Sequence, residues 1–436
     1  MMRILLAANA SYVPPRGGAT RSNLFWLERL ARAGHECRIV CAKLTHDVAG
    51  ARRQMESEEL GALARTIEAY DGVEVIDRAG ILVYAAADPG KRSETLRRQI
   101  GEFWPDWVLV SSEDLGQVLL REAHHYRAGW VVYLAHTPQL FPFGPASWNT
   151  DPQGTELVRN CAGVVAIARH TAQYILEYAG CRAEVIHPPI YGSGPFRKCG
   201  SFENDWITLV NPCAVKGIAI FLELARRFPA RQFAALAGWG TTAEDRKEME
   251  TLPNVTLLAN VRNIERVLER TRVLLMPSLW YEGFGLSVME AMLRGIPVIA
   301  SDSGGLVEAK LGTRFVVPVR AIERYEPEFD EHGLPKAIVP EQDIAPWEEA
   351  LRLLLTDRAL YEEEAEVSRK RALQFVESIR PEGMTEFLSA LSPREAPGVE
   401  AVERARLRDS LAGLSAEKRA LLVQRLRKKA AGSEGA

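Results

Sequence analysis

Short apolar runs alternate with helical patterns along most of the chain, and this alternation strongly limits the folds that it can adopt. In the first half, the candidate strands lie at 3–8, 36–42, 107–110, 130–135, 163–168 and 184–187. Between the first two, residues 20–33 carry Leu24, Leu27 and Leu30 at helical spacing, and Gly34 follows. Strands separated by helices in this way indicate parallel sheets covered by helices.

A second series of the same kind follows a segment at 188–204 that is rich in Gly, Pro, Ser and Lys and is typical of a linker. Its candidate strands lie at 206–210, 232–237, 254–259, 273–276, 297–300 and 314–317. A chain of 436 residues is too long for one ordinary core. We therefore expect an α/β protein with two Rossmann-like domains, residues 1–195 and 203–375, and a ligand in the cleft between them.

Three further segments lie outside this regular pattern. Residues 44–60 are charged and poor in apolar side chains, as in a flexible excursion, and 321–340 is an acidic, irregular insertion that we expect to be a surface loop rather than a lid. Residues 376–393 are expected to form a helix that returns to the first domain. Residues 394–436 are expected to form a linker and a helical tail, whose stretch 400–430 suits a docking partner or a solvated terminal helix.

The composition excludes several classes of protein. A net charge of −3 argues against nucleic acid as a partner, because that binding needs concentrated positive charge. No apolar run approaches the roughly 20 residues that span a bilayer, and the short run at 4–8 predicts a first strand rather than a signal peptide. The six cysteines have neither disulfide nor metal-ligand spacing, which favours a cytoplasmic protein without a metal site.

The segment 277–291 is the most informative motif in the chain. It places Glu282 and Glu290 eight residues apart, with a Gly-Phe-Gly turn between them and an apolar strand in front. A strand, a glycine turn and a helix start together form a place where backbone N–H groups hold a phosphate. Because Glu290 falls on the first turns of that helix, its carboxylate can bind sugar hydroxyls. The motif therefore predicts a nucleotide-sugar enzyme.

Three other motifs occur at similar positions relative to predicted strands. Gly17-Gly18 follows the first strand, His136 follows the fourth, and Lys216-Gly217 opens the first helix of the second domain. In this order, and with 301–308 after the carboxylate pair, the chain resembles glycosyltransferase family 4, whose members are retaining enzymes of GT-B fold. The resemblance covers roughly residues 2–390 and implies a transferase of the EC 2.4 class.

The resemblance implies a role for each matching residue. Lys216, His136 and Glu282 would form the catalytic group, in which Lys216 neutralises the leaving β-phosphate and His136 lies beside the donor sugar. Glu290 would bind the ribose, and backbone near Val261 would contact the base. The remaining donor-binding positions implied by the resemblance are Gly17, Gly18, Asn211, Gly283, Phe284, Gly285 and Leu286.

The chemistry expected at such a site follows from charge. Breaking a sugar–phosphate bond leaves an oxocarbenium-like sugar and an anionic leaving group, so the site needs fixed positive charge and N–H donors. Lys216 and the helix that starts near Gly285 supply these without a metal or an organic cofactor. In the mechanism proposed for the family, the departing phosphate takes the proton of the acceptor, and the anomeric configuration is retained.

One departure from the family pattern concerns the phosphate. The family usually has Gly-Arg where this chain has Val210-Asn211, and loss of that arginine weakens leaving-group stabilisation unless another cation replaces it. Arg16 and Arg21 flank the glycine loop and are candidates. The same departure leaves open a nucleotide-sugar-binding scaffold without catalysis, and a GT-B epimerase or phosphorylase is a further alternative.

The acceptor is less well defined by the sequence. The aromatic residues Phe141, Phe143 and Trp148 suit an acceptor pocket and a packed loop equally well. A small molecule or a glycan is the expected acceptor. A short match at 414–422 to segments that flank modules of peptide and polyketide assembly lines suggests a secondary metabolite.

Overall fold

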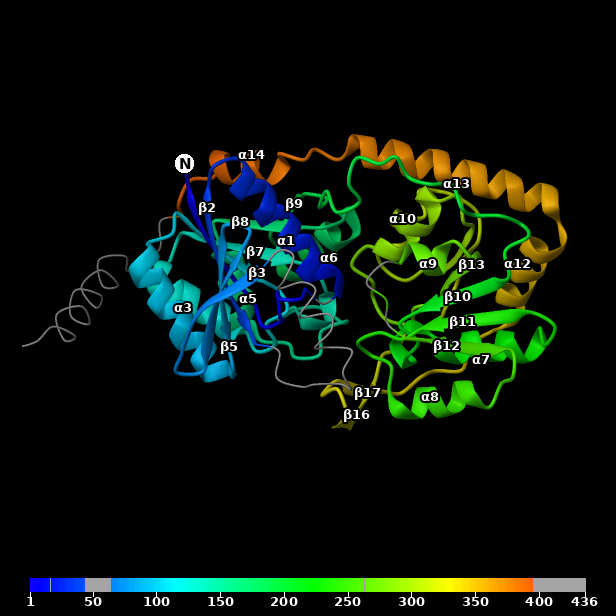
Figure 1. The fold of residues 1–436 in the computed structure, drawn as a ribbon. Helices are drawn as coiled ribbons and strands as arrows, with labels where there is room; N and C mark the ends of the chain where they lie inside the picture. The colour runs from blue at the N-terminus through cyan, green and yellow to red at the C-terminus, as the bar shows by residue number, and fades with distance from the viewer. Residues whose placement is uncertain (16, 44–63, 260, 262–263, 395–436) are drawn as a thin grey trace, which may run out of the picture.

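The computed structural model describes residues 1–15, 17–43, 64–259, 261 and 264–394 of the chain. Figure 1 shows two lobes side by side, each with a central sheet and helices packed around it. Each lobe has its own sheet and hydrophobic core, with residues of both lobes meeting in one shared cluster. The predicted α/β class with two consecutive units of sheet and helices is confirmed.

The N-terminal lobe is built on a nine-stranded sheet within the described residues. Its strands are β1 (Arg3–Ala7), β2 (Glu36–Ala42), β3 (Ala64–Tyr70), β4 (Val73–Arg78), β5 (Ile81–Ala86), β6 (Trp107–Ser111), β7 (Val131–Ala135), β8 (Gly163–Ala166) and β9 (Glu184–Val185). Their order across the sheet is β3-β4-β5-β2-β1-β6-β7-β8-β9. Strands β6 and β7 are buried along their whole length, as expected for central strands of a parallel sheet.

One edge of this sheet was not predicted. Strand β4 pairs antiparallel with β3 on one side and with β5 on the other, and β5 then joins β2 in parallel. Ala79 and Gly80, both with positive φ, form the tight turn between β4 and β5. Because β3 is exposed over most of its length, it has no continuous apolar run that a sequence pattern could reveal.

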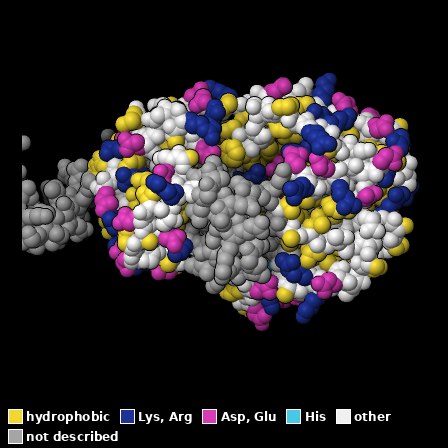
Figure 2. Space-filling view, in the orientation of Figure 1, with side chains coloured by type: hydrophobic (Ala, Val, Ile, Leu, Met, Phe, Trp, Pro, Cys, Tyr) yellow, Lys and Arg dark blue, Asp and Glu magenta, His cyan; other side chains and the backbone are white. Residues whose placement is uncertain are grey.

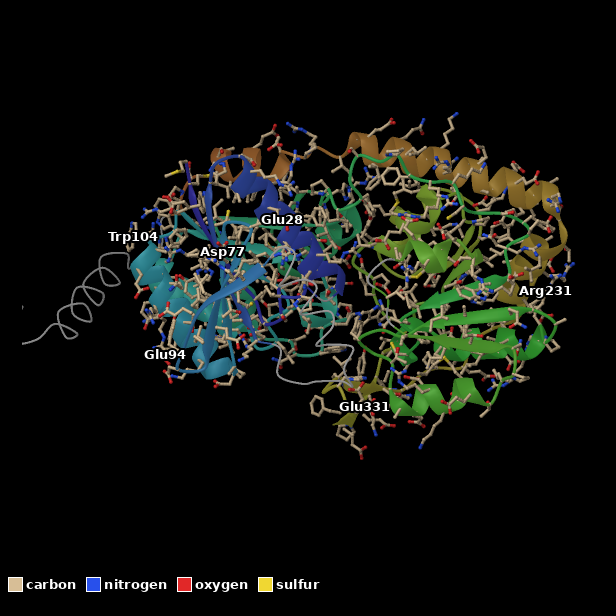
Figure 3. The ribbon with its side chains drawn as sticks, in the orientation of Figure 1. Glu28, Asp77, Glu94, Trp104, Arg231 and Glu331 are labelled. Atoms are coloured by element: carbon tan, nitrogen blue, oxygen red, sulfur yellow. The ribbon has the colours of Figure 1, made fainter. Side chains whose placement is uncertain are left out.

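Helices cover both sides of the N-terminal sheet. They are α1 (Gly17–Arg32), α3 (Pro89–Phe103), α4 (Val118–Arg127), the 3-10 helix η1 (Pro138–Leu140), α5 (Pro152–Arg159) and α6 (Arg169–Ala179). Figure 3 labels Glu28 on α1, whose carboxylate pairs with Arg78 at the end of β4 at 3.4 Å. This contact ties the first helix to the antiparallel edge of the sheet.

The C-terminal lobe contains a second, parallel sheet. Its strands are β10 (Trp206–Val210), β11 (Gln232–Leu236), β12 (Val255–Leu258), β13 (Thr271–Met276), β14 (Val298–Ser301) and β15 (Val316–Val317), in the order β12-β11-β10-β13-β14-β15. Its helices are η2 (Ala214–Lys216), α7 (Ile218–Arg227), α8 (Ala243–Glu250), α9 (Glu265–Leu268), α10 (Leu286–Leu293), α11 (Leu306–Ala309), α12 (Ala345–Thr356) and α13 (Arg358–Ser378). The order reverses between β10 and β13, and ligands of open α/β sheets bind at such a point.

The acidic insertion has a regular structure, which corrects the expectation of an irregular loop. Strands β16 (Tyr325–Phe329) and β17 (Pro335–Ala337) pair antiparallel as a separate hairpin. Asp330 closes the turn by accepting hydrogen bonds from the backbone N–H groups of His332 and Leu334, both at 2.9 Å. The hairpin lies to the left of α8 at the lower side of the molecule in Figure 1.

The chain then runs from one lobe to the other. Helix α13 lies along the outside of the C-terminal lobe, and α14 (Gly383–Ala390) packs against the N-terminal lobe (Figure 1). Glu382, just before α14, pairs with Arg29 of α1 at 2.7 Å. Among the described residues, no helix is both long and apolar enough to cross a membrane. The predicted excursion at 44–60 and the helical tail at 400–430 lie outside the described residues.

Candidate active site

The glycine turn before α10 has the geometry of an anion site. Gly285 adopts φ 107°, and a Cβ there would lie 2.6 Å from Cδ2 of Leu306, so a side chain would be both strained and crowded. Leu286 begins α10 directly after this turn. The first N–H groups of a helix lack partners within it and carry the positive end of its dipole. The turn therefore presents donors at the carboxyl end of the sheet, where a phosphate is expected.

Lys216 and Glu282 form a buried ion pair next to this turn. The side chains are 13% and 10% exposed, and Nζ of Lys216 donates to Oε1 of Glu282. The hydroxyl of Ser278 also donates to that oxygen, at 2.5 Å. Burial raises the pKa of Glu282, but the charge and hydrogen bond of Lys216 outweigh it and hold the pKa below its usual value. Glu282 is therefore an ionised group rather than a proton donor.

Asn211 occupies a constrained position at the end of β10. Its φ is +59°, a conformation that asparagine tolerates better than most residues. The side-chain oxygen accepts the N–H of Gly240 at 2.9 Å, whereas the amide nitrogen is buried and has no hydrogen-bond partner within the described structure. Asn211 therefore offers an unpaired N–H donor at the position where the resemblance implies an arginine.

Glu290 lies on α10 and contacts the opposite lobe. Arg21 of α1 pairs with its carboxylate at 3.3 Å. A Cβ at Gly18 would lie 2.9 Å from Cδ1 of Leu286, so the glycine loop of the N-terminal lobe lies against the start of α10. Gly17, with φ 85°, begins α1. Residues 17, 18, 286 and 290 are therefore neighbours in the fold, although they come from distant parts of the sequence. Arg16 lies outside the described residues.

His136 is a buried, neutral histidine at the end of β7. Its Nε2 is 2.7 Å from Oδ1 of Asn23, and burial lowers its pKa to about 3. Its Nδ1 is buried without a partner in the described structure. The backbone oxygen of His136 approaches Gly283 so closely that a Cβ at Gly283 would lie only 2.2 Å from it. His136 thus lies at the contact between the two lobes, where its role is not that of an acid.

The turn residues Gly283 and Phe284 are held in place by contacts with the N-terminal lobe, the linker and α13. Oγ1 of Thr171, on α6, donates to the carbonyl of Gly283 at 3.1 Å. The ring of Phe284 is buried between His187 and Phe375, with centroids at 5.4 and 5.5 Å. Only the backbone of Phe284 is therefore placed for a ligand. Val261 follows β12 and is partly buried.

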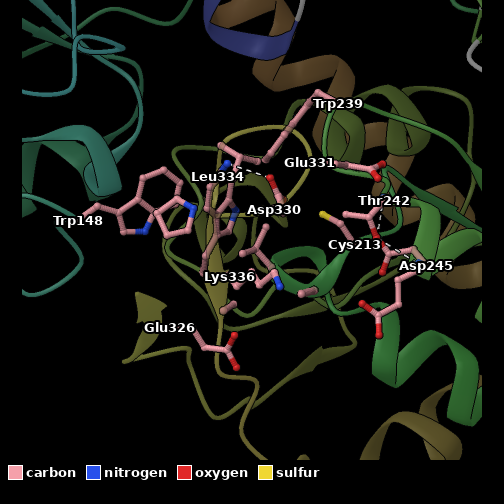
Figure 4. Close-up of a pocket in the computed structure, with 17 residues that line it drawn as sticks. Trp148, Cys213, Trp239, Thr242, Asp245, Glu326, Asp330, Glu331, Leu334 and Lys336 are labelled. Carbon is pink, nitrogen blue, oxygen red and sulfur yellow. Dashed lines mark hydrogen bonds between the residues drawn. The ribbon is translucent and has the colours of Figure 1, made fainter. Parts of the chain in front are cut away.

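The three predicted acceptor residues have different surroundings. Phe141 and Phe143 are buried in the N-terminal core beside Tyr174, with the packing expected of a loop that fills the interior. Trp148 instead lines a cavity together with Trp239 and Trp280 of the C-terminal lobe (Figure 4).

Sequence reasoning missed the two tryptophans of the C-terminal lobe. Trp239 lies between two glycines after β11, and Trp280 lies two residues before Glu282. The available signal was therefore an aromatic residue between glycines at a strand end and another beside the carboxylate pair.

The N-terminal lobe also holds Glu113, directly after the Ser111-Ser112 pair at the end of β6. Burial raises the pKa of its carboxyl to about 7, and Oε2 has no partner in the part of the chain that the structure describes.

Two lobes with largely parallel sheets and a phosphate-type turn at their junction are the architecture of the GT-B fold. The family model described as Glycosyltransferase Family 4 matches residues 16–191, and the one described as Glycosyl transferases group 1 matches residues 207–357. The two matches together span most of both lobes. The chain therefore belongs to the family 4 glycosyltransferases, and it is an enzyme of the EC 2.4 class.

Solved structures show the same fold at low sequence identity. Anabaena Alr3699/HepE in complex with UDP-glucose is 16% identical with a TM-score of 0.61, over 90% of this chain and 100% of that one. Sucrose-phosphate synthase from Thermosynechococcus elongatus is 16% identical with a TM-score of 0.62, over 89% and 98%. WaaG, a glycosyltransferase involved in lipopolysaccharide biosynthesis, is 14% identical with a TM-score of 0.57, over 89% and 100%. The comparison with curated proteins found no match.

Proposed function

We propose that this protein transfers a sugar from a nucleoside diphosphate sugar to an acceptor hydroxyl with retention of configuration. The observation that carries this proposal is the convergence of Lys216, Glu282 and the start of α10 with Glu290 and the glycine loop of the opposite lobe. In this proposal Lys216 meets the β-phosphate next to the sugar, the start of α10 binds the diphosphate, and Glu290 binds the ribose.

Each group has a defined task in the proposed reaction. The bond between the anomeric carbon and the phosphate oxygen breaks, and the phosphate leaves with the bonding electrons. Lys216 and the N–H groups at the start of α10 stabilise that charge, which grows as the bond breaks. A phosphate oxygen takes the acceptor proton while the acceptor oxygen bonds to the anomeric carbon from the same face. Glu282 stays ionised throughout and orients both Lys216 and the donor sugar.

A uridine diphosphate donor is the first to test. Alr3699/HepE, which shares the fold, is described in complex with UDP-glucose. In the present chain, Glu290 on α10 would accept hydrogen bonds from ribose hydroxyls, and Val261 would lie near the base. Arg21, already within 3.3 Å of Glu290, would move to the diphosphate and supply the positive charge that Asn211 lacks.

A thermal-shift panel of uridine, guanosine and adenosine diphosphate sugars tests donor binding, because a ligand that binds only the folded state raises the melting temperature. One donor class is expected to raise it clearly above the others. Glu290→Ala should abolish that shift, and an unchanged shift would refute the ribose role. Measured with a chelator present, the same shift also tests the proposed independence from a metal.

The alternative of a scaffold that binds nucleotide sugars without catalysis rests on Asn211. Release of nucleoside diphosphate from the preferred donor separates the two functions. The transferase releases it with water or an added acceptor, whereas the scaffold binds the donor and leaves it intact. An epimerase would instead change the sugar while it remains attached to the nucleotide.

A further inference from the structure

A cavity of about 460 Å³ lies under the β16–β17 hairpin, next to the proposed donor site (Figure 4). Its volume falls within the range of roughly 300–1,000 Å³ that is typical of small-molecule sites. Most of the described residues that line it belong to the C-terminal lobe, and Trp148 comes from the N-terminal lobe. We call it the hairpin cavity.

The aromatic wall of the hairpin cavity consists of three tryptophans. The ring of Trp280 lies 6.2 Å from that of Trp148 and 5.6 Å from that of Trp239. Trp148 also meets Tyr325 of the hairpin edge-on at 5.7 Å. Trp239 is 40% exposed, which is unusual for so large an apolar side chain and leaves ring surface open to a ligand. Ring faces of this kind attract C–H groups of sugars and cations alike.

The lining is also rich in carboxylates. Four of them belong to Glu244, Glu326, Asp330 and Glu331. Of these, Asp330 and Glu331 also accept backbone N–H groups and remain negatively charged. A fifth, Asp245, already caps α8 by accepting the N–H and hydroxyl of Thr242 at 2.8 and 2.7 Å. The single lysine in the lining, Lys336, pairs with Glu328 at 3.1 Å, so its charge is already balanced. The excess of carboxylates disfavours a phosphate here and favours a positively charged ligand.

The cavity is joined to the proposed reaction centre by Trp280. Nζ of Lys216 lies 4.5 Å from the centre of its ring, and Glu282 follows two residues later. Residues 213–215, at the start of η2 and directly before Lys216, form another part of the lining. A molecule in the cavity would thus lie near Lys216 and Glu282, where the proposed reaction takes place.

We propose that the hairpin cavity binds a saccharide that carries a protonated amino group, as part of the acceptor. The tryptophans contact its rings, and the carboxylates of the hairpin and α8 bind its ammonium and hydroxyl groups. This proposal rests on the proposed glycosyl transfer, but binding in the cavity is measurable without any donor. The acidic insertion is then a recognition element for the acceptor.

Binding of glucosamine to the intact protein, measured by saturation-transfer NMR and by fluorescence titration, tests the proposal. N-acetylglucosamine and glucose 6-phosphate serve as its neutral and anionic counterparts. Glucosamine is expected to bind most tightly, with an affinity that falls as salt is added. Trp239→Ala and Glu326→Gln should each weaken it by about three- to thirtyfold. Phe329→Ala is the matched control, because this exposed residue is on the same hairpin but outside the lining and should change nothing.

Equal binding of the three saccharides, or preference for the anionic one, would overturn the proposal, as would equal losses in Phe329→Ala and Trp239→Ala. The nucleotide-sugar thermal shift is measured on the same variants. If glucosamine fails while that shift persists, only the acceptor proposal is wrong. If the shift fails in the wild-type protein, the proposed transfer is wrong whatever the cavity binds.

Discussion

The buried pair of Lys216 and Glu282 gives a prediction that depends on no substrate. Lys216→Met removes the cation and leaves the carboxyl group of Glu282 nearly buried, with the Ser278 hydroxyl still donating to it. Breaking a buried pair by removing one partner costs about 3–5 kcal/mol. Because the Ser278 hydrogen bond persists, we expect a loss of about 3 kcal/mol at pH 7. For a lobe of this size, that lowers the melting temperature by about 6–12 °C.

The pH dependence has a definite sign. In the wild-type protein the pKa of Glu282 lies below its usual value, so the carboxylate adds stability above about pH 4.5 that is lost as the pH falls through the lower, folded-state pKa. In Lys216→Met the charge and the hydrogen bond of Lys216 no longer lower the pKa of Glu282, so that burial, the largest cause, raises it against the hydrogen bond that remains from Ser278. The folded variant then holds a proton that the unfolded chain releases. Its deficit relative to wild type should therefore grow from about pH 4.5 to pH 7.

Melting curves at several pH values, measured for wild type, both single variants and Lys216→Met/Glu282→Gln, test this reasoning. The double variant should recover most of the loss, since no unpaired charge remains. Lys198→Met removes the exposed pair with Glu366 and should cost no more than about 1 kcal/mol. A Lys216→Met deficit as small as that of Lys198→Met, or one that does not change with pH, would refute the account of a buried pair.

Three further predictions concern the contact between the lobes. Arg21→Met should lower the rate of donor hydrolysis by tenfold or more, and Arg21→Lys should lower it by less. Arg29→Met is the control: it breaks the contact between α1 and Glu382 and should leave the rate within about twofold. His136 has a pKa of about 3 in the folded protein, so between about pH 6.5 and 4 only the unfolded chain binds a proton there and the free energy of unfolding falls as the pH falls. His136→Gln should reduce the slope of that fall by about 1.4 kcal/mol per pH unit. An unchanged slope in denaturant titrations would contradict this. Gly283→Ala should reduce turnover strongly, since the added methyl group would meet the backbone oxygen of His136; wild-type kinetics would show that the contact is unimportant.

The part of the site that is local in sequence could be predicted from sequence. Strand, glycine turn and helix at 273–293 fix Glu282 and Glu290 on one side of the C-terminal sheet, and these elements form as their pattern indicates. The glycine loop at 17–18 could be assigned to the N-terminal side of the cleft, facing the carboxylates. It follows the first strand, and ligands of open α/β sheets bind at the carboxyl ends of the strands. Its contact with Leu286 follows from the way the two lobes meet.

The parts that could not be predicted depend on contacts between distant segments. His136 follows β7 and Asn23 lies on α1. The two side chains meet because the end of β7 lies next to α1 in the folded lobe, which no local pattern encodes. The β16–β17 hairpin could not be predicted because its strands are largely exposed and interrupt their apolar residues with glutamate, lysine and proline, so that they contain no apolar run. Phe141 and Trp148 are seven residues apart in one aromatic stretch, and only the fold shows that one is interior and the other lines a cavity.

The anomeric configuration of the sugar released by hydrolysis tests the central claim most directly. UDP-glucose labelled at its anomeric carbon is followed by NMR before the free sugar can mutarotate, with Lys216→Met as the control. The account predicts that wild type releases α-glucose first and that the variant releases it at least tenfold more slowly. Release of the β-anomer first would contradict retention, and a protein that binds the donor but never cleaves it would contradict catalysis.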